Sequence, residues 1–174
     1  VVGGKETGTA ATTSSLSVLA HDRAGFAFSG GRIPGSYNID GTPMTGSVIL
    51  YVAEQTKNTI SMDVTGASAN PCVGIQNILY AYKKGKDARP LIVRLVAQVT
   101  DPATLDGGDL VIENANLATG HITIEGVGKD AVADGWGIRL KNAANVEVRN
   151  IGIMNVNSGE GDNVGLQQNN DHIW

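Results

Sequence analysis

The feature that most constrains this chain is a repeat of short, strand-like segments in its second half. Ile112-Glu-Asn114 recurs as Leu140-Lys-Asn142 and again as Leu166-Gln-Gln168, at intervals of 28 and 26 residues. A second series with about the same interval is Ile122-Thr-Ile124, Val146-Glu-Val148 and the segment near Ile173. Glycine, asparagine and aspartate separate these segments, and no helical pattern lies between them. The strands expected here are Leu91–Val96, Leu110–Ile112, Ile122–Ile124, Ile138–Leu140, Val146–Val148, Ile151–Ile153, Val164–Leu166 and a last one at Ile173.

Two interleaved strand series with one repeat length are typical of a coiled parallel sheet, in which each turn of the chain stacks on the turn before it. Strands this short cannot be stable alone, so their burial must come from stacking. We expect Asn114, Asn142 and Gln168 to lie above one another as a buried ladder of amide side chains. An antiparallel sandwich is the alternative; it accounts for the strand lengths but not for the repeated positions.

The first half of the chain has a different texture. Residues 1–20, small and polar at first, are expected to form an extended N-terminal arm, and residues 21–174 a single domain. Between residues 24 and 47 the density of glycine, with Pro34 and Pro43, predicts loops and short extended pieces. Val48–Val52 and Thr59–Val64 have the composition of strands.

One helix is predicted, and it begins near residue 70. Asn70 is a suitable N-cap, and Pro71 follows at the first helical position, where its missing N–H does no harm. An apolar stripe at helical spacing then runs along one face, and Gly85 suits the end of the helix. The residues of the stripe are Ile75, Ile78, Leu79 and Tyr82.

Composition excludes several classes of function. No apolar run is long enough to cross a membrane, and no basic segment followed by an apolar one opens the chain as a secretion signal. With 13 basic and 17 acidic residues and no basic block, nucleic acid is not expected as a partner.

Several short motifs carry no site. Cys72 is the single cysteine, and the histidines lack metal-ligand spacing. Asp106-Gly-Gly-Asp109 is too short for an EF-hand loop and is predicted to be a turn. Gly126–Ala131 matches a dinucleotide-binding loop but lacks the following helix, so it too is predicted to be a turn.

Glu160-Gly-Asp162 is the candidate site. The two carboxylates lie just before a predicted strand, and residues two apart on extended backbone point to the same side. Like charges in this position repel unless they are solvated or share a cation, and hard oxygen ligands suit Ca²⁺. From spacing alone, a solvated turn and a calcium site both remain open.

Several segments, in their order and spacing, resemble the pectate lyases of polysaccharide lyase family one. They are residues 135–153 (GWGIRLKNAANVEVRNIGI), Gly161-Asp162 before a strand, Asn170-Asp-His-Ile-Trp174, and His121–Gly128 ahead of them. The likeness is good from about residue 88 onward and weaker before it. It implies an all-β fold, a right-handed parallel β-helix whose N-terminal turns are capped by an α-helix, in agreement with the repeat and the helix above.

The resemblance also implies a function. Enzymes of this family cleave α-1,4-linked polygalacturonate (pectate) by calcium-assisted β-elimination, and they are secreted. Their Gly-Asp motif supplies a primary Ca²⁺ ligand, here Asp162, and the acidic residue two positions earlier, here Glu160, can also coordinate. Neither Arg139 nor Arg149 matches the position of the family's catalytic arginine. The resemblance therefore implies no catalytic residue in this chain, and we expect the C-terminal remainder of the enzyme as a second polypeptide.

Two alternatives remain beside the pectate lyase. A pectin lyase shares the fold but acts on methylated substrate without calcium, which leaves Glu160 and Asp162 without a purpose. A non-catalytic β-helix, such as an adhesin or a carbohydrate-binding stalk, is compatible with the repeat alone.

Overall fold

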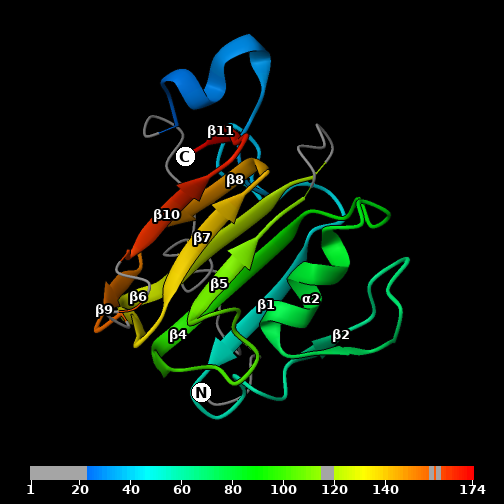
Figure 1. Cartoon of the computed structure of the whole chain (residues 1–174). Coiled ribbons are helices and arrows are strands. Elements are labelled where there is room, and N and C mark those ends of the chain that lie inside the picture. The colour runs from blue at the N-terminus through cyan, green and yellow to red at the C-terminus, as the bar shows by residue number, and fades with distance from the viewer. Residues whose placement is uncertain (1–22, 115–119, 157–158, 160–161) are drawn as a thin grey trace, which may run out of the picture.

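The computed structural model describes residues 23–114, 120–156, 159 and 162–174, which leaves the predicted arm and Glu160 outside the described residues. The described part is mostly β-strand, with few helices (Figure 1). Its elements are η2 (Phe26–Gly31), β1 (Val48–Ala53), β2 (Ser61–Met62), β3 (Cys72–Val73), α2 (Ile75–Tyr82), β4 (Leu91–Thr100), β5 (Asp109–Ile112), β6 (Ile122–Asp134), β7 (Gly137–Lys141), β8 (Ala144–Arg149), β9 (Gly152–Met154), β10 (Val164–Gln167) and β11 (Asp171–Ile173).

Two parallel sheets dominate the described residues. One has the order β1-β4-β6-β8-β11, with β9 also pairing with β6, and the other has the order β10-β7-β5. The repeat seen in the sequence sets the register of the second sheet, because Ile112 pairs with Leu140 and Leu140 with Leu166. In the first sheet Ile122 pairs with Val146. The parallel sheets are therefore confirmed, and the antiparallel sandwich is wrong.

The apolar side chains of these strands fill the interior between the sheets. Along the register, Leu91, Ile122 and Val146 form one buried column, and Leu110 and Ile138 belong to another. Trp136 is buried among them and donates its indole N–H to the Val99 carbonyl at 2.8 Å. Each strand buries only a few side chains, so the core exists only because the strands stack.

Asparagine residues turn the chain at the strand ends. Asn142 and Gln168 lie in register, both with positive φ (47° and 59°), and the Asn142 amide donates to Gln168 Oε1 at 2.6 Å. This part of the predicted amide ladder is confirmed, although it lies at the surface. Asn114 is not part of it: its amide bonds the N–H and C=O of Ala144 and is buried. The prediction for Asn114 is wrong because its side chain satisfies the first residue of β8 instead of a neighbouring amide.

The predicted helix is present but begins later than expected. α2 starts at Ile75, with Gly74 at its N-cap and no side-chain cap. The Asn70 amide instead bonds the N–H and C=O of Val64, at 3.0 and 3.1 Å. Cys72–Val73 pairs with β2, so this segment is extended and cannot belong to the first helical turn. The predicted apolar stripe from Ile75 to Tyr82 is buried, as expected.

The strand at Ile122 is longer than predicted. β6 runs to Asp134 and contains the segment Gly126–Ala131 that was predicted to be a turn. Its pairing with β4 skips from Val127 to Val132, and Gly128 has a φ of 78°, so the chain does change direction there. The bend therefore lies inside β6, and not between two separate strands as predicted.

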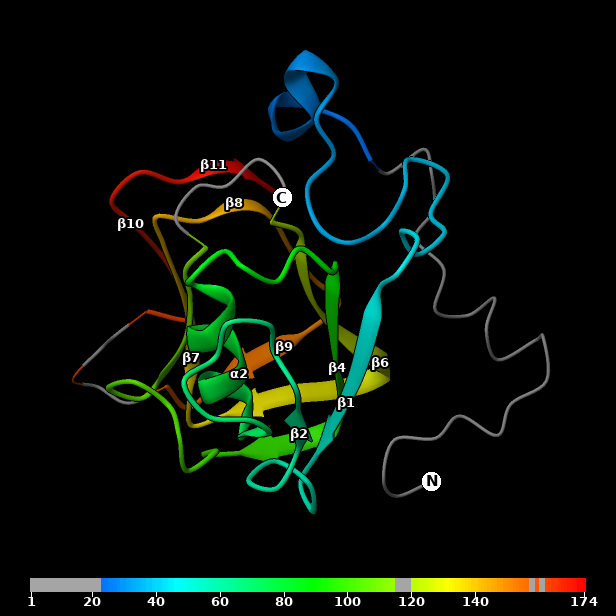
Figure 2. The same cartoon turned by 90° about the vertical axis from the view of Figure 1, so that its right-hand side faces the viewer.

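An N-terminal segment, residues 23–47, lies over the outer face of β4, β6 and β8, and its first part, η2, packs against β11. Here it is called the N-terminal cover. It is attached by hydrogen bonds: Ser36 N–H donates to Thr123 Oγ1 at 2.8 Å, and Gly35 N–H donates to the Asn145 carbonyl at 2.9 Å. In Figure 1, η2 lies near β11, whereas α2 lies at the other end of the stack. Figure 2 shows β1 and β4 side by side, in agreement with their pairing.

Candidate functional site

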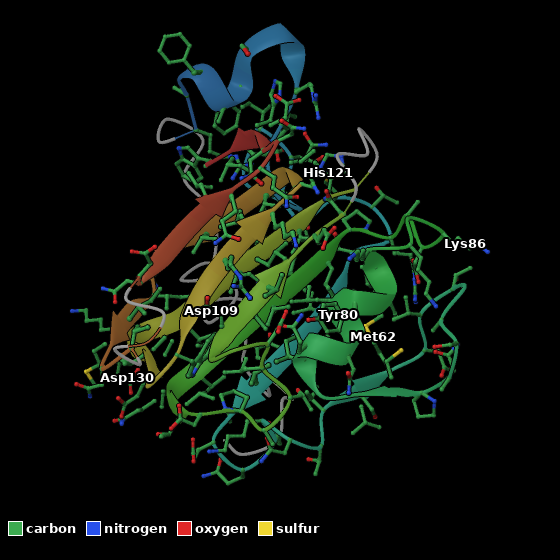
Figure 3. The ribbon with its side chains drawn as sticks, in the orientation of Figure 1. Met62, Tyr80, Lys86, Asp109, His121 and Asp130 are labelled. Atoms are coloured by element: carbon green, nitrogen blue, oxygen red, sulfur yellow. The ribbon has the colours of Figure 1, made fainter. Side chains whose placement is uncertain are left out.

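The outer face of the sheet β10-β7-β5 carries the candidate site. Because side chains alternate along a strand, the apolar residues of β5 and β7 point inward and the residues between them point outward. The outward residues include Asp109 on β5 and Arg139 on β7. Figure 3 labels Asp109 on this sheet and Tyr80 on the neighbouring α2. No described segment lies over this face as the N-terminal cover lies over the other sheet.

Asp162 lies just before the start of β10, at the border of this face. It is exposed and comes two residues before β10. A Cβ built on Gly165 of β10 would meet only the Asp162 carboxylate, Oδ2 being 3.8 Å away. Gly165 pairs with Arg139, its neighbour on β7. Glycine within a strand often marks a place where a ligand approaches the backbone closely.

Three oxygen atoms converge on Gly137, the first residue of β7. A Cβ at this position would lie 2.6 Å from the Asp162 carbonyl oxygen, 2.7 Å from Asp109 Oδ1 and 3.1 Å from the Asn163 carbonyl oxygen. Only glycine fits there. The close approach brings Asp109, far away in the sequence, to the segment that contains Asp162.

A charged network fixes the β5 side of this face. Arg139 donates to the Asp106 carbonyl at 3.2 Å and lies 3.5 and 3.7 Å from the carboxylates of Asp106 and Asp109. The Tyr80 hydroxyl donates to Asp106 Oδ2 at 2.7 Å. Burial, followed by the bond to Asp106, raises the pKa of Tyr80 to about 12. Tyr80 therefore stays protonated at neutral pH and acts here as a hydrogen-bond donor.

The donor set at Asp162 suits a calcium ion in its chemistry. Carboxylate and carbonyl oxygens are the ligands that Ca²⁺ prefers, and it takes 6–8 of them. Within the described ranges, no group of three or more His, Cys, Asp or Glu residues is close enough to hold a metal. Asp162 would thus be one ligand among several, and Glu160, its predicted companion, lies outside the described residues.

Asp106, Asp109 and Tyr80 were missed as site residues by reasoning from the sequence. The segment Asp106-Gly-Gly-Asp109 was predicted to be a turn, and it is one: the backbone N–H groups of Asp106 and Asp109 each donate to the other's carbonyl. Its position on the same sheet face as Asp162 depends on parallel pairing across β5, β7 and β10. The repeat interval was the one sequence feature that could have aligned them.

The two arginines that the resemblance left without a catalytic role have structural partners. Arg139 belongs to the network with Asp106 and Asp109. Arg149 lies on the other sheet, where it bonds Glu125 and lies over the ring of Tyr37 at 5.1 Å from its centroid. Both arginines are thereby engaged in interactions within the fold.

A depression beside α2 is a second concave feature. Its volume is about 370 Å³, and Cys72, Tyr80 and Lys84 are among the residues that line it. It has no acidic residue in its lining, so it does not suit a calcium ion. Burial raises the pKa of the Cys72 thiol, which disfavours a reactive thiolate.

Comparison with protein-family models, with curated proteins and with solved structures gave no match to this chain. In the part of the chain that the structure describes, no helix has the length and apolar character needed to cross a membrane.

Proposed function

We propose that this chain carries the cation-binding part of a pectate lyase that cleaves α-1,4-linked polygalacturonate by calcium-assisted β-elimination. The observation that carries the proposal is the position of Asp162. Its carboxylate lies over the bare backbone of Gly165, on the outer face of a parallel sheet that the sequence repeat aligns. This is the residue to which the resemblance gives the role of primary Ca²⁺ ligand.

We further propose that the strands continue one coil, a right-handed parallel β-helix with α2 as its cap. Successive passes of the chain support this: β5 is followed by β6, β7 by β8 and β9, and β10 by β11, each pairing in parallel with the pass before. A coil of this kind presents the outward side chains of its sheets as long, flat faces, which suit an extended polymer.

The chemistry of β-elimination explains why carboxylates would be needed. Removal of the proton at C5 of a uronate places negative charge next to the sugar carboxylate. A bound calcium ion would neutralise that carboxylate and stabilise the developing enolate-like charge. In this chain Asp162, with Glu160 as its expected companion, would hold the cation. Arg139 adds a positive charge on the same face, next in register to Gly165.

The proposal assigns the catalytic base to neither Arg139 nor Arg149. The resemblance places the catalytic arginine in the C-terminal remainder of the enzyme, and both arginines considered above are held in other interactions. We therefore propose that this remainder supplies the base, and that the enzyme is secreted.

Calcium binding by this chain tests the role of Asp162. Isothermal titration of the purified chain with CaCl₂ should give a saturable site, and Asp162→Asn should weaken it at least tenfold, because a charged ligand is lost. Unfolding in urea should change by no more than about 0.5 kcal/mol, since Asp162 is exposed.

Asp130→Asn is the matched control, since Asp130 is also an exposed aspartate. Equal weakening by both variants, or calcium affinity unchanged in Asp162→Asn, contradicts the assignment. The reaction itself is measured by the ultraviolet absorbance of unsaturated product from polygalacturonate, first with calcium and then with a chelator. Activity that persists in chelator favours the pectin lyase; binding of the polymer without any product in the complete enzyme favours the non-catalytic β-helix.

A further inference from the structure

The depression beside α2, called the α2 depression below, lies between one face of the helix and the segment that precedes it. Asn77 and Tyr80 line it from the helix, and Lys84 lines it from just beyond the helix end. Side chains three and four residues apart share one face of a helix, and the opposite face of α2 is buried in the core. Residues 67–73 contribute the other wall. The volume of about 370 Å³ lies within the range of small-molecule sites.

Tyr80 lines the α2 depression, while its hydroxyl is bonded outside it. The side chain is 37% exposed, and the hydroxyl donates to Asp106 Oδ2 at 2.7 Å. Asp106 belongs to the turn before β5 and is not among the residues that line the depression. The hydrogen bond therefore holds the aromatic ring in one orientation. A flat apolar surface that is held in place suits the C–H face of a sugar ring.

Lys84 gives the α2 depression a positive charge. Of the described residues that line the depression, it is the only one with a charged side chain. Its charge acts on the buried Cys72 beside it: burial and the charge of Asp63 raise the pKa of the Cys72 thiol, and the charge of Lys84 opposes them. Asp63 itself does not line the depression. A carboxylate is the ligand group that an ammonium in such a place favours.

Two further side chains can bond hydroxyl groups. Asn77 donates from Nδ2 to the Val73 carbonyl at 2.8 Å, which fixes the amide with Oδ1 as its acceptor. Ser68, on the other wall, is exposed, and its hydroxyl can both donate and accept. The lining thus combines an aromatic ring, an ammonium group, an amide and a hydroxyl, which together match the groups of a sugar acid.

We propose that the α2 depression binds a uronate residue of an acidic oligosaccharide, with the sugar carboxylate at Lys84 and the C–H face of the ring on Tyr80. The inference rests on the proposed function for the identity of the sugar, galacturonate. Tyr80 also connects the depression to the candidate site, because its hydroxyl bonds Asp106, which lies 3.5 Å from Arg139. A polymer that occupies both places gains affinity from the second without any new contact at the first.

Trigalacturonate, the α-1,4-linked trimer, is the probe. It is titrated into the ¹⁵N-labelled chain in the presence of a chelator, so that calcium plays no part, and binding is followed by the NMR shifts of the backbone amides. We expect saturable shifts within residues 77–84, with a Kd on the order of 1 mM. The trimethyl ester of the same trimer has the same length but no charge. It should bind at least about fivefold more weakly, because Lys84 then lacks its partner.

Variants of the chain locate the binding. Tyr80→Ala should weaken it at least about tenfold, whereas Tyr80→Phe keeps the ring and should stay within about twofold of the wild type. Lys84→Gln should weaken it at least about fivefold. Lys86→Gln is the matched control, since it removes the same charge from an exposed lysine that Figure 3 shows away from Tyr80. Circular dichroism confirms that each variant is folded.

The proposal is overturned by a lack of saturable shifts within residues 77–84, by equal binding of the trimethyl ester, or by equal weakening in Lys86→Gln. Equal losses in Tyr80→Phe and Tyr80→Ala also overturn it, because the bond to Asp106 would then be what matters. So does binding that Asp162→Asn abolishes in chelator, which would put the trimer at the candidate site instead. Failure of the calcium titration contradicts the role of Asp162 but leaves the result of this calcium-free experiment unchanged.

Discussion

Two sheet faces in this protein carry similar sets of charged residues, but in different surroundings. On the sheet β4-β6-β8, Arg94, Glu125 and Arg149 stand in register beneath the N-terminal cover. On the sheet β5-β7-β10, Asp109 and Arg139 stand on a face that no described segment covers. The side chains of Arg94 and Glu125 are 7% and 4% exposed; on the other face Asp109 is equally buried at 7%, whereas Arg139 is 19% and the neighbouring Asp106 52% exposed.

The charged residues of the covered face are buried and paired with one another. Tyr37 of the cover donates to Glu125 Oε1 at 2.5 Å, and Arg94 donates to the same oxygen at 2.8 Å. Arg23, fully buried, bonds Glu147 at 2.8 Å. Burial, followed by the charge of Glu125, raises the pKa of Tyr37 to about 12, so its hydroxyl remains a donor. Charges enclosed in this way hold the fold together, whereas on the open face Asp106 is exposed and Arg139 partly so.

The largest effect should come from breaking the covered network at its centre. Glu125 accepts from Tyr37, Arg94 and Arg149, so Glu125→Ala leaves buried donors and charges without their acceptor. We expect the free energy of unfolding, measured in urea, to fall by about 3–5 kcal/mol.

Glu113→Ala is the comparison on the open side. Glu113 follows β5 and pairs at 2.9 Å with Lys83; the side chains of Glu113 and Lys83 are 12% and 48% exposed. Because Lys83 is half-solvated and can turn to water when its partner is removed, we expect a loss of about 1 kcal/mol. Similar losses in the two variants would show that the cover does not determine what a charge contributes.

The fit of the cover itself is tested at Gly35. Its φ is 72°, and a Cβ there would lie 2.6 Å from Thr123 Oγ1 and closer still to the Glu147 carboxylate. Gly46 has a φ of 79° and nothing within 4 Å, so Gly46→Ala measures the backbone strain alone. We expect Gly35→Ala to lose about 1–3 kcal/mol more than Gly46→Ala, because it also overpacks the cover against β6 and β8. Equal losses would mean that the cover can lift away without cost.

The sequence predicted the open face better than the covered one, for a physical reason. Strand existence follows from local pattern, so β5, β7 and β10 were predicted within a residue or two of their observed bounds. The repeat interval then aligned Ile112, Leu140 and Leu166 correctly. Asn114 was misplaced because the choice between a neighbouring amide and the backbone of Ala144 depends on atomic positions at a corner.

The strands of the other sheet were predicted, but the segment that covers it and the charged network beneath were not. The local pattern around Arg23 and Tyr37 indicates only loops, and that around Glu147 only an ordinary strand. Arg23 and Glu147, which bond each other, are more than a hundred residues apart in the sequence. Nothing local distinguishes Glu147, a fully buried carboxylate, from an exposed one in an alternating strand. The same limitation applies to Asp109 and Asp162, which are brought together only through Gly137.

The smallest expected effect is a pH dependence that belongs to the covered face. Burial raises the pKa of Glu147, against the opposing influence of Arg23, Arg149 and Thr123 and with a contribution from Glu125. The native state therefore binds a proton more tightly than the unfolded chain, whose glutamates have a pKa of about 4.3. Stability attributable to this group is present at low pH and falls as the pH rises through the native pKa of Glu147.

Asp87 has the opposite sign and serves as the control. Its hydrogen bonds with Arg89 lower its pKa to about 2, so its contribution is present above the unfolded value of about 3.9 and is lost as the pH falls toward 2. Urea unfolding should be measured across this pH range. In the wild type, stability should fall as the pH rises above ~4.3, and Glu147→Gln should remove that fall; stability should also increase as the pH rises from about 2 to about 3.9, and Asp87→Asn should remove that increase. A Glu147→Gln profile parallel to that of the wild type would mean that this carboxylate is not enclosed, and that the two faces differ less than their geometry indicates.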